Sequence, residues 1–212
     1  MKIILRNAGV LLPESKIKFP NLDVLNGQKI LIQGDSGAGK STLFKVILGF
    51  ERLSFGELMI NDANVSDEDF WQLRRKIAYV DQDISLPPMK AYDWFLFLFS
   101  FKANRPAEFS KDIVGRWFDF FQLPLNILEK NIGNLSGGER QRLGLISAIL
   151  LNRKAFILDE PTSFLNKPLK SKASGLFLNR SDWTVLVCSH DSEWMREGVD
   201  VVPFLSSKAG EK

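Results

Sequence analysis

The stretch GDSGAGKST, at positions 34–42, contains the pattern GxxxxGKS between a short apolar run and a segment with helical spacing. Glycines in such a loop let consecutive backbone N–H groups converge on a phosphate, and a following helix adds the positive end of its dipole. Lys40 is expected to reach the β- and γ-phosphates of a nucleotide, and the Ser41 hydroxyl to bind Mg²⁺. The stretch therefore predicts a nucleotide site made by Gly34, Asp35, Ser36, Gly37, Ala38, Gly39, Lys40, Ser41 and Thr42.

The segments around this phosphate-binding loop alternate between strand-like and helix-like patterns. KILIQ (29–33) is an apolar run bounded by glycines, and STLFKVIL (41–48) has the apolar spacing of a helix that ends at Gly49. Further strands are predicted at 57–60, 77–80, 155–158 and 184–189. Strands that are apolar throughout usually lie in a sheet covered on both faces, so we expect an α/β fold.

Between residues 83 and 134 the pattern changes to aromatic segments with helical spacing, AYDWFLFLFSF (91–101) and IVGRWFDFFQL (113–123). These predict a helical subdomain inserted into the α/β core. We expect most of the aromatic side chains to pack in the core, because aromatic residues dominate core burial. We expect a minority of these aromatic side chains to contact a partner.

Composition excludes several classes of protein. The 212 residues carry a net charge of +3 that is spread along the chain, so no nucleic-acid partner is expected. The single cysteine, Cys188, excludes an internal disulfide and suits a reducing compartment. No run approaches the roughly 18 apolar residues of a membrane span, and the N-terminus lacks the pattern of a signal peptide, so we expect a cytosolic chain.

Two further stretches contain charged or glycine-rich motifs. AFILDEP (155–161) ends an apolar strand in two carboxylates. Asp159 is placed to hold Mg²⁺ through its water shell, and Glu160 to orient and deprotonate a water beyond the γ-phosphate; the alternative is a pair of solvated acids at a strand end. LSGGERQRL (135–143) places a serine and two glycines ahead of a basic helix, which is a second anion site in a chain that already has one.

LSGGERQR followed by ILDEP resembles the nucleotide-binding domain of ATP-binding cassette (ABC) proteins. Gln82 in YVDQD resembles the glutamine of that family's Q-loop, and His190 in LVCSHD resembles its switch histidine. The five motifs follow the family order across almost the whole chain. The resemblance implies one domain, residues 1–212, in which a P-loop NTPase core of ABC type carries an N-terminal β subdomain and a helical subdomain at about 83–145 with the signature motif.

The same resemblance implies roles for individual residues. Lys40, Gln82, Glu160 and His190 take the catalytic positions, and Ser41, Gln82 and Asp159 the metal-binding positions, with ATP and Mg²⁺ as cofactors. In this family each ATP lies between two subunits. Ser136, Gly137 and Gly138, here called the signature segment, would therefore bind the γ-phosphate of an ATP held by the other protomer of an ATP-dependent homodimer or of a pair with another ABC subunit.

Two departures from the family pattern affect what we expect of the site. The segment that commonly carries an aromatic residue stacked on adenine reads NAGVLLP (7–13) here, which predicts aliphatic contact with the base and leaves discrimination between ATP and GTP open. After the two carboxylates the chain reads SFLN (163–166), with Asn166 where the family usually has aspartate. This replacement predicts weaker communication between the two sites.

The resemblance favours the separate ATPase subunit of a bacterial ABC transporter, cytoplasmic and held at the inner face of the membrane by an integral membrane permease. LPPMKAYDWFLF (86–97) occupies the position where the family contacts the permease, and the run 121–146 resembles a small group that includes an iron-export ATPase subunit. The alternatives are a soluble ABC ATPase acting on DNA or the ribosome, or a regulatory ATP-binding module. A GTPase is disfavoured because NKPL (166–169) lacks the aspartate of a guanine-binding motif.

Overall fold

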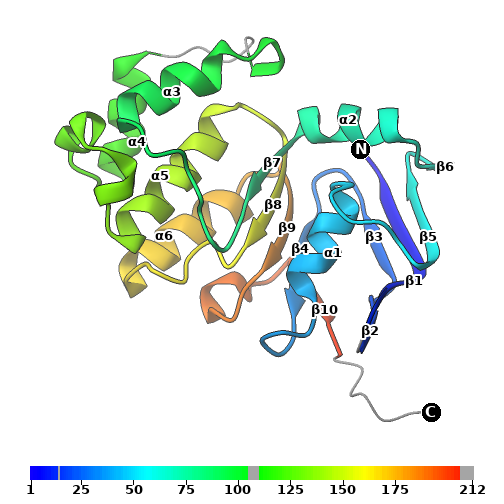
Figure 1. Ribbon diagram of the computed structural model, residues 1–212. Coiled ribbons are helices and arrows are strands. Elements are labelled where there is room, and N and C mark those ends of the chain that lie inside the picture. The colour runs from blue at the N-terminus through cyan, green and yellow to red at the C-terminus, as the bar shows by residue number, and fades with distance from the viewer. Residues whose placement is uncertain (14, 105–109, 206–212) are drawn as a thin grey trace.

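The computed structural model describes residues 1–13, 15–104 and 110–205 and has two sheets with helices between and beside them (Figure 1). The antiparallel sheet has the order β2-β1-β5-β6, with β3 also paired to β1. Its strands are β1 (Ile3–Leu12), β2 (Ser15–Lys18), β3 (Leu22–Val24), β5 (Phe55–Ile60) and β6 (Ala63–Asn64). This sheet is the predicted N-terminal β subdomain.

The second sheet is parallel and has the order β10-β4-β9-β8-β7. Its strands are β4 (Lys29–Gln33), β7 (Ile77–Val80), β8 (Ala155–Asp159), β9 (Thr184–Cys188) and β10 (Asp200–Pro203). Four of the five lie where apolar runs predict strands. β10 is exposed along most of its length and lies at the edge of the sheet, so its sequence has no pattern of burial that would predict it.

Six α-helices complete the described fold. They are α1 (Lys40–Ile47), α2 (Asp67–Lys76), α3 (Ala91–Ser100), α4 (Lys111–Phe120), α5 (Gly137–Leu150) and α6 (Lys167–Leu178). The described chain also has four short 3-10 helices: η1 (Lys102–Asn104), η2 (Leu125–Glu129), η3 (Ile132–Asn134) and η4 (Ser192–Trp194). The predicted end of α1 is confirmed, since Gly49 follows the helix in the left-handed region, at φ 70°, and its N–H donates to Val46 O.

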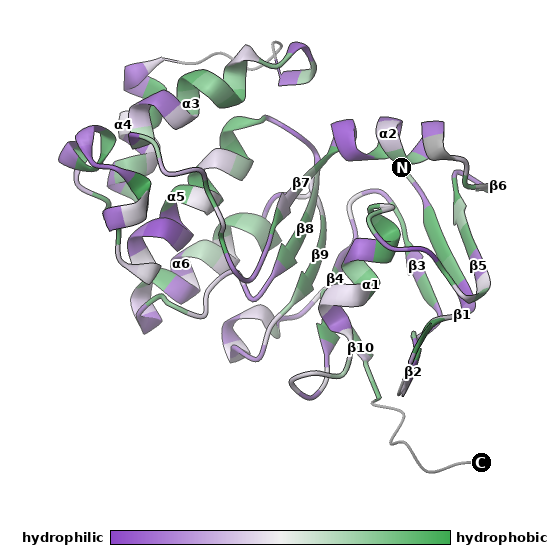
Figure 2. Cartoon of the chain, in the orientation of Figure 1, coloured by the Kyte–Doolittle hydropathy of each residue, from purple (hydrophilic) through white to green (hydrophobic). Residues whose placement is uncertain are grey.

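The strands of the parallel sheet are largely apolar, as their green colour in Figure 2 shows, and β8 and β9 are buried along their whole length. Alternate residues of a strand point to opposite faces. Accordingly Ile157 packs in the core shared with α1 and the antiparallel sheet, whereas its neighbours Phe156 and Leu158 pack in the core shared with α5 and α6. The α/β expectation is thereby confirmed.

The helical insertion contains α3 and α4, and its aromatic side chains divide as expected. Phe95, Phe118 and Phe121 are fully buried, and most of the others pack against the same core. Phe97 and Phe101 remain exposed on and just after α3. Within the described part of the chain, no helix has both the length and the apolar character needed to cross a membrane.

Candidate nucleotide-binding site

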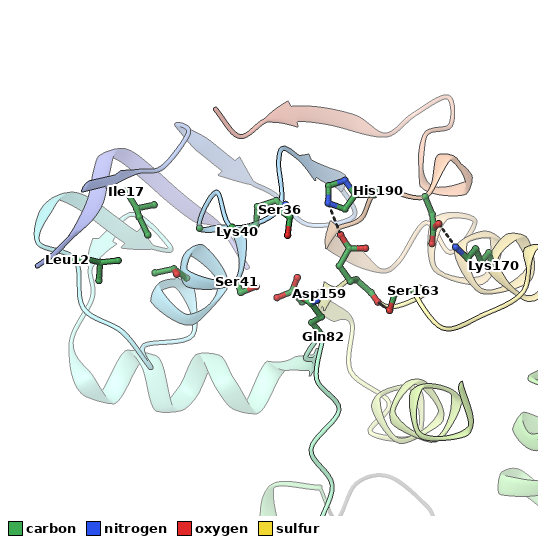
Figure 3. Close-up of a pocket in the computed structure, with 15 residues that line it drawn as sticks. Leu12, Ile17, Ser36, Lys40, Ser41, Gln82, Asp159, Ser163, Lys170 and His190 are labelled. Carbon is green, nitrogen blue, oxygen red and sulfur yellow. Dashed lines mark hydrogen bonds and ion pairs between the residues drawn. The ribbon is translucent and has the colours of Figure 1, made fainter. Parts of the chain in front are cut away.

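A cavity of about 650 Å³, here called the nucleotide cavity, opens at the carboxyl ends of four neighbouring parallel strands (Figure 3). Parallel α/β sheets bind their ligands at this edge, because the loops that follow the strands meet there. β4 leads into the phosphate-binding loop, β7 precedes Gln82, β8 ends at Asp159, and β9 precedes His190. The residues of the sequence prediction that line the cavity are Ser36, Gly37, Gly39, Lys40, Ser41, Thr42, Gln82, Asp159, Glu160 and His190.

The phosphate-binding loop is shaped by a glycine that no other residue could replace without strain. Gly39 has φ 105°, in the left-handed region, and a Cβ there would lie 2.6 Å from Ile17 Cγ2. α1 begins at the next residue, and its first turn carries no acidic side chain. Lys40 Nζ donates to Gly34 O at 2.8 Å and Asp35 O at 2.7 Å. The loop therefore presents an ammonium group and a helix N-terminus to the cavity, which suits a polyphosphate.

Asp159, at the end of β8, is 1% exposed, and its Oδ2 atom is buried without a hydrogen-bond partner in the described part of the chain. Burial raises the pKa of this carboxyl, and the nearby Ser41 hydroxyl opposes the shift. A buried carboxylate oxygen without a partner requires a donor or a cation. Ser41, Gln82 and Asp159 all carry side-chain oxygen atoms and line the same cavity, so the residues present fit Mg²⁺.

Glu160 has an unusual backbone for a residue other than glycine, with φ 44°. Residues held in such sparsely populated regions cost about 1–3 kcal/mol and are common at functional sites. Its side chain is 13% exposed, and Oε1 lies 3.4 Å from His190 Nε2. Burial raises the pKa of Glu160, with His190 acting in the opposite direction. A carboxylate with a raised pKa is a stronger base, which suits the abstraction of a proton from water.

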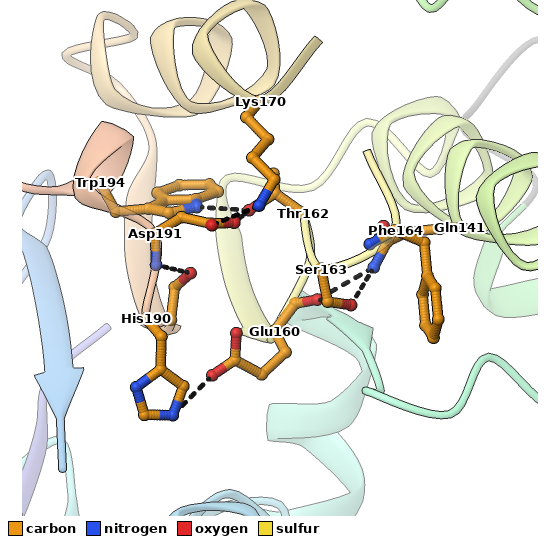
Figure 4. A network of polar contacts seen from close by, with 10 residues as sticks. Gln141, Glu160, Thr162, Ser163, Phe164, Lys170, His190, Asp191 and Trp194 are labelled. Atoms are coloured by element: carbon orange, nitrogen blue, oxygen red, sulfur yellow. Dashed lines mark hydrogen bonds and ion pairs between the residues drawn. The ribbon is translucent and has the colours of Figure 1, made fainter. Parts of the chain in front are cut away.

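The segment after His190 is fixed to α6 and to the segment after β8 by polar contacts for which the sequence gives no signal (Figure 4). Asp191 forms an ion pair with Lys170 of α6 and accepts a hydrogen bond from Thr162 Oγ1 at 2.6 Å. Trp194 Nε1 in turn donates to the Thr162 hydroxyl at 3.0 Å. Lys170 and Asp191 also line the nucleotide cavity. Their meeting depends on tertiary contacts between segments that are distant along the chain.

None of the three residues of the signature segment lines the nucleotide cavity of its own chain. Ser136 caps α5: its hydroxyl accepts from Glu139 N at 3.2 Å, and its own N–H donates to Glu139 Oε2 at 2.8 Å. Gly137 and Gly138 line a second cavity of about 540 Å³, which Gln82 also lines. This second cavity is here called the signature cavity. The two predicted phosphate sites are thus separate within one chain.

The structure shows the surroundings of the two departures from the family pattern. Leu12 and Ile17 form the aliphatic side of the nucleotide cavity, and the described lining contains no Phe, Tyr or Trp. Asn166 caps α6, because its Oδ1 accepts from Leu169 N at 3.1 Å. Asparagine and aspartate are comparable caps, so the replacement costs the helix little. Its effect on communication between sites stays a prediction.

Comparisons with known proteins agree with this geometry. The family model described as "ABC transporter" matches residues 17–163. The chain is 32% identical to the probable iron export ATP-binding protein FetA of Escherichia coli K12, over 98% of this chain and 92% of that protein. It is 30% identical to the glutamine transport ATP-binding protein GlnQ of Geobacillus stearothermophilus, over 89% and 80%.

Solved structures give the same result. A dimeric structure of MJ0796, described as a bacterial ABC transporter cassette, aligns with a TM-score of 0.77 at 25% identity over 95% of this chain and 94% of that one. A dimeric post-hydrolysis state of MJ0796, bound to ADP and Pi, aligns equally well.

Proposed function

The chain belongs to the ABC transporter family and is an ATPase, and we propose that it acts as the cytoplasmic ATPase subunit of a membrane transporter through a dimer that holds ATP between its subunits. We infer the dimer from the separation of the two phosphate sites. The phosphate-binding loop and Glu160 line the nucleotide cavity. Gly137 and Gly138 of the signature segment line the signature cavity, and Ser136 caps α5. In this proposal the signature segment completes the site of the partner subunit.

Residue roles in the proposed site follow from their positions around the nucleotide cavity. Residues 34–42 bind the phosphates, and Lys40 neutralises charge on the β- and γ-phosphates. Ser41, Gln82 and Asp159 would hold Mg²⁺, which when bound offsets the negative charge of the phosphates. Glu160 orients the attacking water and accepts its proton, and His190, 3.4 Å away, orients the carboxylate.

The proposed domain organisation is one nucleotide-binding domain, residues 1–212, with its helical subdomain at about 83–145. The permease would contact the segment after Gln82, where Leu96, Phe97 and Phe101 are exposed. Exposed apolar and aromatic side chains of this kind suit a protein interface. That contact would hold the subunit at the inner face of the membrane. FetA and GlnQ serve different cargoes at similar identity, so the proposal names no cargo.

Dimerisation should depend on nucleotide. Without nucleotide the isolated subunit is expected to sediment as a monomer, because much of the proposed interface consists of two ATP molecules. MgATP should produce dimers that disappear as ATP is hydrolysed. Sedimentation velocity with and without MgATP makes this measurement, with Lys40→Ala as a matched control that should stay monomeric in both. A stable dimer in the absence of nucleotide would require a different interface.

Base selectivity should be weak. Leu12 and Ile17 line the cavity and have no side-chain hydrogen-bonding groups, so they would supply apolar contact to the base without distinguishing the polar edges of adenine and guanine. We expect GTP to compete with ATP to within about tenfold, or about 1.4 kcal/mol. A competition titration measures the ratio of dissociation constants. A preference for ATP of more than about a hundredfold, or about 2.7 kcal/mol, would mean that another residue recognises the base.

A further inference from the structure

Gln141 of α5 is buried, and the hydrogen bonds of its side-chain amide all go to the segment that follows β8. It is 1% exposed. Nε2 donates to Glu160 O at 3.0 Å and to Ser163 Oγ at 3.1 Å, and Oε1 accepts from Phe164 N at 2.9 Å. Figure 4 shows the amide between α5 and this segment. Neither the proposed catalysis nor the proposed phosphate contacts use this residue.

The contacts of Gln141 restrain the backbone on one side of Glu160. On the other side, Glu160 N donates to Cys188 O of β9 at 2.9 Å. The residue between these two restraints has φ 44°, a conformation that persists only where the surroundings determine it. Because the backbone dihedrals set the direction in which a side chain leaves the chain, the two restraints together aim the Glu160 carboxylate.

We propose that Gln141 is a positioning residue for Glu160 of its own subunit, through its hydrogen bonds to Glu160 O, Ser163 Oγ and Phe164 N. The inference rests on the proposed function, in which Glu160 is the base. It gives α5 two roles in two different sites. The start of the helix, which belongs to the signature segment, serves the partner's ATP, whereas Gln141 serves the base that acts on the subunit's own ATP.

The first test is Gln141→Met, which keeps the length of the side chain and removes its polar atoms. We expect kcat to fall by about 10- to 100-fold, since misplacing a catalytic group by 1 Å can cost 10²-fold in rate. KM for ATP should stay within about twofold, because the phosphate-binding loop is unchanged. A kcat like that of the unmodified protein would overturn the inference.

The matched control is Ser147→Ala, on the same helix. Ser147 is 6% exposed, donates to Leu143 O and accepts from Trp94 Nε1 at 2.9 Å, so its loss also leaves a polar group, the partly buried indole N–H of Trp94, without this partner. It contacts the helical insertion and not the segment after β8. Both variants should lower the temperature of thermal unfolding, but only Gln141→Met should lower kcat. An equal loss of kcat in both would mean that the effect is general destabilisation.

The second test locates the subunit on which Gln141 acts. In a heterodimer of Lys40→Ala and Ser136→Arg subunits, the one intact site combines the phosphate-binding loop and Glu160 of the Ser136→Arg subunit with the signature segment of the other. Adding Gln141→Met to the Ser136→Arg subunit should lower the activity of this heterodimer by the same 10- to 100-fold. The same change in the Lys40→Ala subunit lies beside a Glu160 that faces the damaged site, so activity should stay within about twofold.

The outcomes separate the alternatives. Loss of activity only when Gln141→Met is in the Lys40→Ala subunit would mean that Gln141 acts through the signature segment, and equal loss in both would indicate general weakening; each overturns the inference. A heterodimer that is inactive even with Gln141 intact counts against the proposed composite site. In that case the kcat and KM of the Gln141→Met protein still decide whether the residue positions Glu160.

Discussion

Replacing Glu160 by Gln is expected to lower the rate of ATP hydrolysis by about 10²- to 10⁴-fold, the usual contribution of a general base. Glutamine keeps the shape of the side chain but cannot accept the proton of the attacking water. The contacts to the phosphates come from residues 34–42 and do not change, so ATP binding should persist. Dimers with bound ATP should then accumulate, because the hydrolysis that separates them is blocked.

Single-turnover hydrolysis and sedimentation of the Glu160→Gln protein with MgATP test both parts of this prediction. The control is Glu57→Gln, which changes an exposed glutamate of β5 in the same way and should leave the rate and the dimerisation unaltered. Turnover of Glu160→Gln close to that of the unmodified protein would remove Glu160 from the role of base. Another residue of the cavity would then have to activate the water.

The elements that place the site were predictable because they follow simple patterns. Apolar runs locate β4, β7, β8 and β9, and a predicted site residue lies at the end of each strand or within two residues after it. The loop glycines indicate a phosphate site without reference to the rest of the fold, since only glycine readily adopts the backbone of Gly39. That four strand ends form one cavity follows from their parallel arrangement.

Features created by tertiary contact could not be predicted in this way. The left-handed backbone of Glu160 has no sequence signal, because the residue is not glycine. Lys170 is one of several lysines on α6 and is distinguished only by its ion pair with Asp191. Gln141 resembles an ordinary polar helix residue, yet it is buried because α5 packs beside the segment after β8. Each of these roles requires the positions of two segments that are distant along the chain.

A mixture of two inactive variants is expected to recover ATPase activity if the signature segment acts on the partner's ATP. Lys40→Ala damages the phosphate-binding loop of a subunit, and Ser136→Arg places a bulky cation in the signature segment that the subunit offers its partner. Each homodimer then has a damaged half in both of its sites. Each should lose at least about 10²-fold in rate, because both halves must surround one γ-phosphate.

Arginine at position 136 also removes the cap of α5, which costs about 0.5–2 kcal/mol, so loss of the cap must be separated from loss of the phosphate contact. Ser110 provides the control, because its Oγ caps α4 by accepting from Ile113 N at 3.1 Å, as Ser136 Oγ accepts from Glu139 N at the start of α5. Ser110→Arg should lower the thermal stability by a similar amount and keep the activity. Inactivity of Ser136→Arg alone would then be assigned to the signature segment.

In the heterodimer the damaged halves fall together in one site, and the other site combines an intact phosphate-binding loop with an intact Ser136. One complete site is therefore restored, and the mixture should hydrolyse ATP where neither variant does. If the signature segment instead served the ATP of its own chain, every subunit would contain a damaged half and no combination could recover activity. ATPase rates and ATP-dependent crosslinking of the mixture decide between the two. Absence of recovery in both measurements would exclude a signature segment that acts across the dimer, and would leave the separation of the two cavities in one chain to be explained by a conformational change that brings them together.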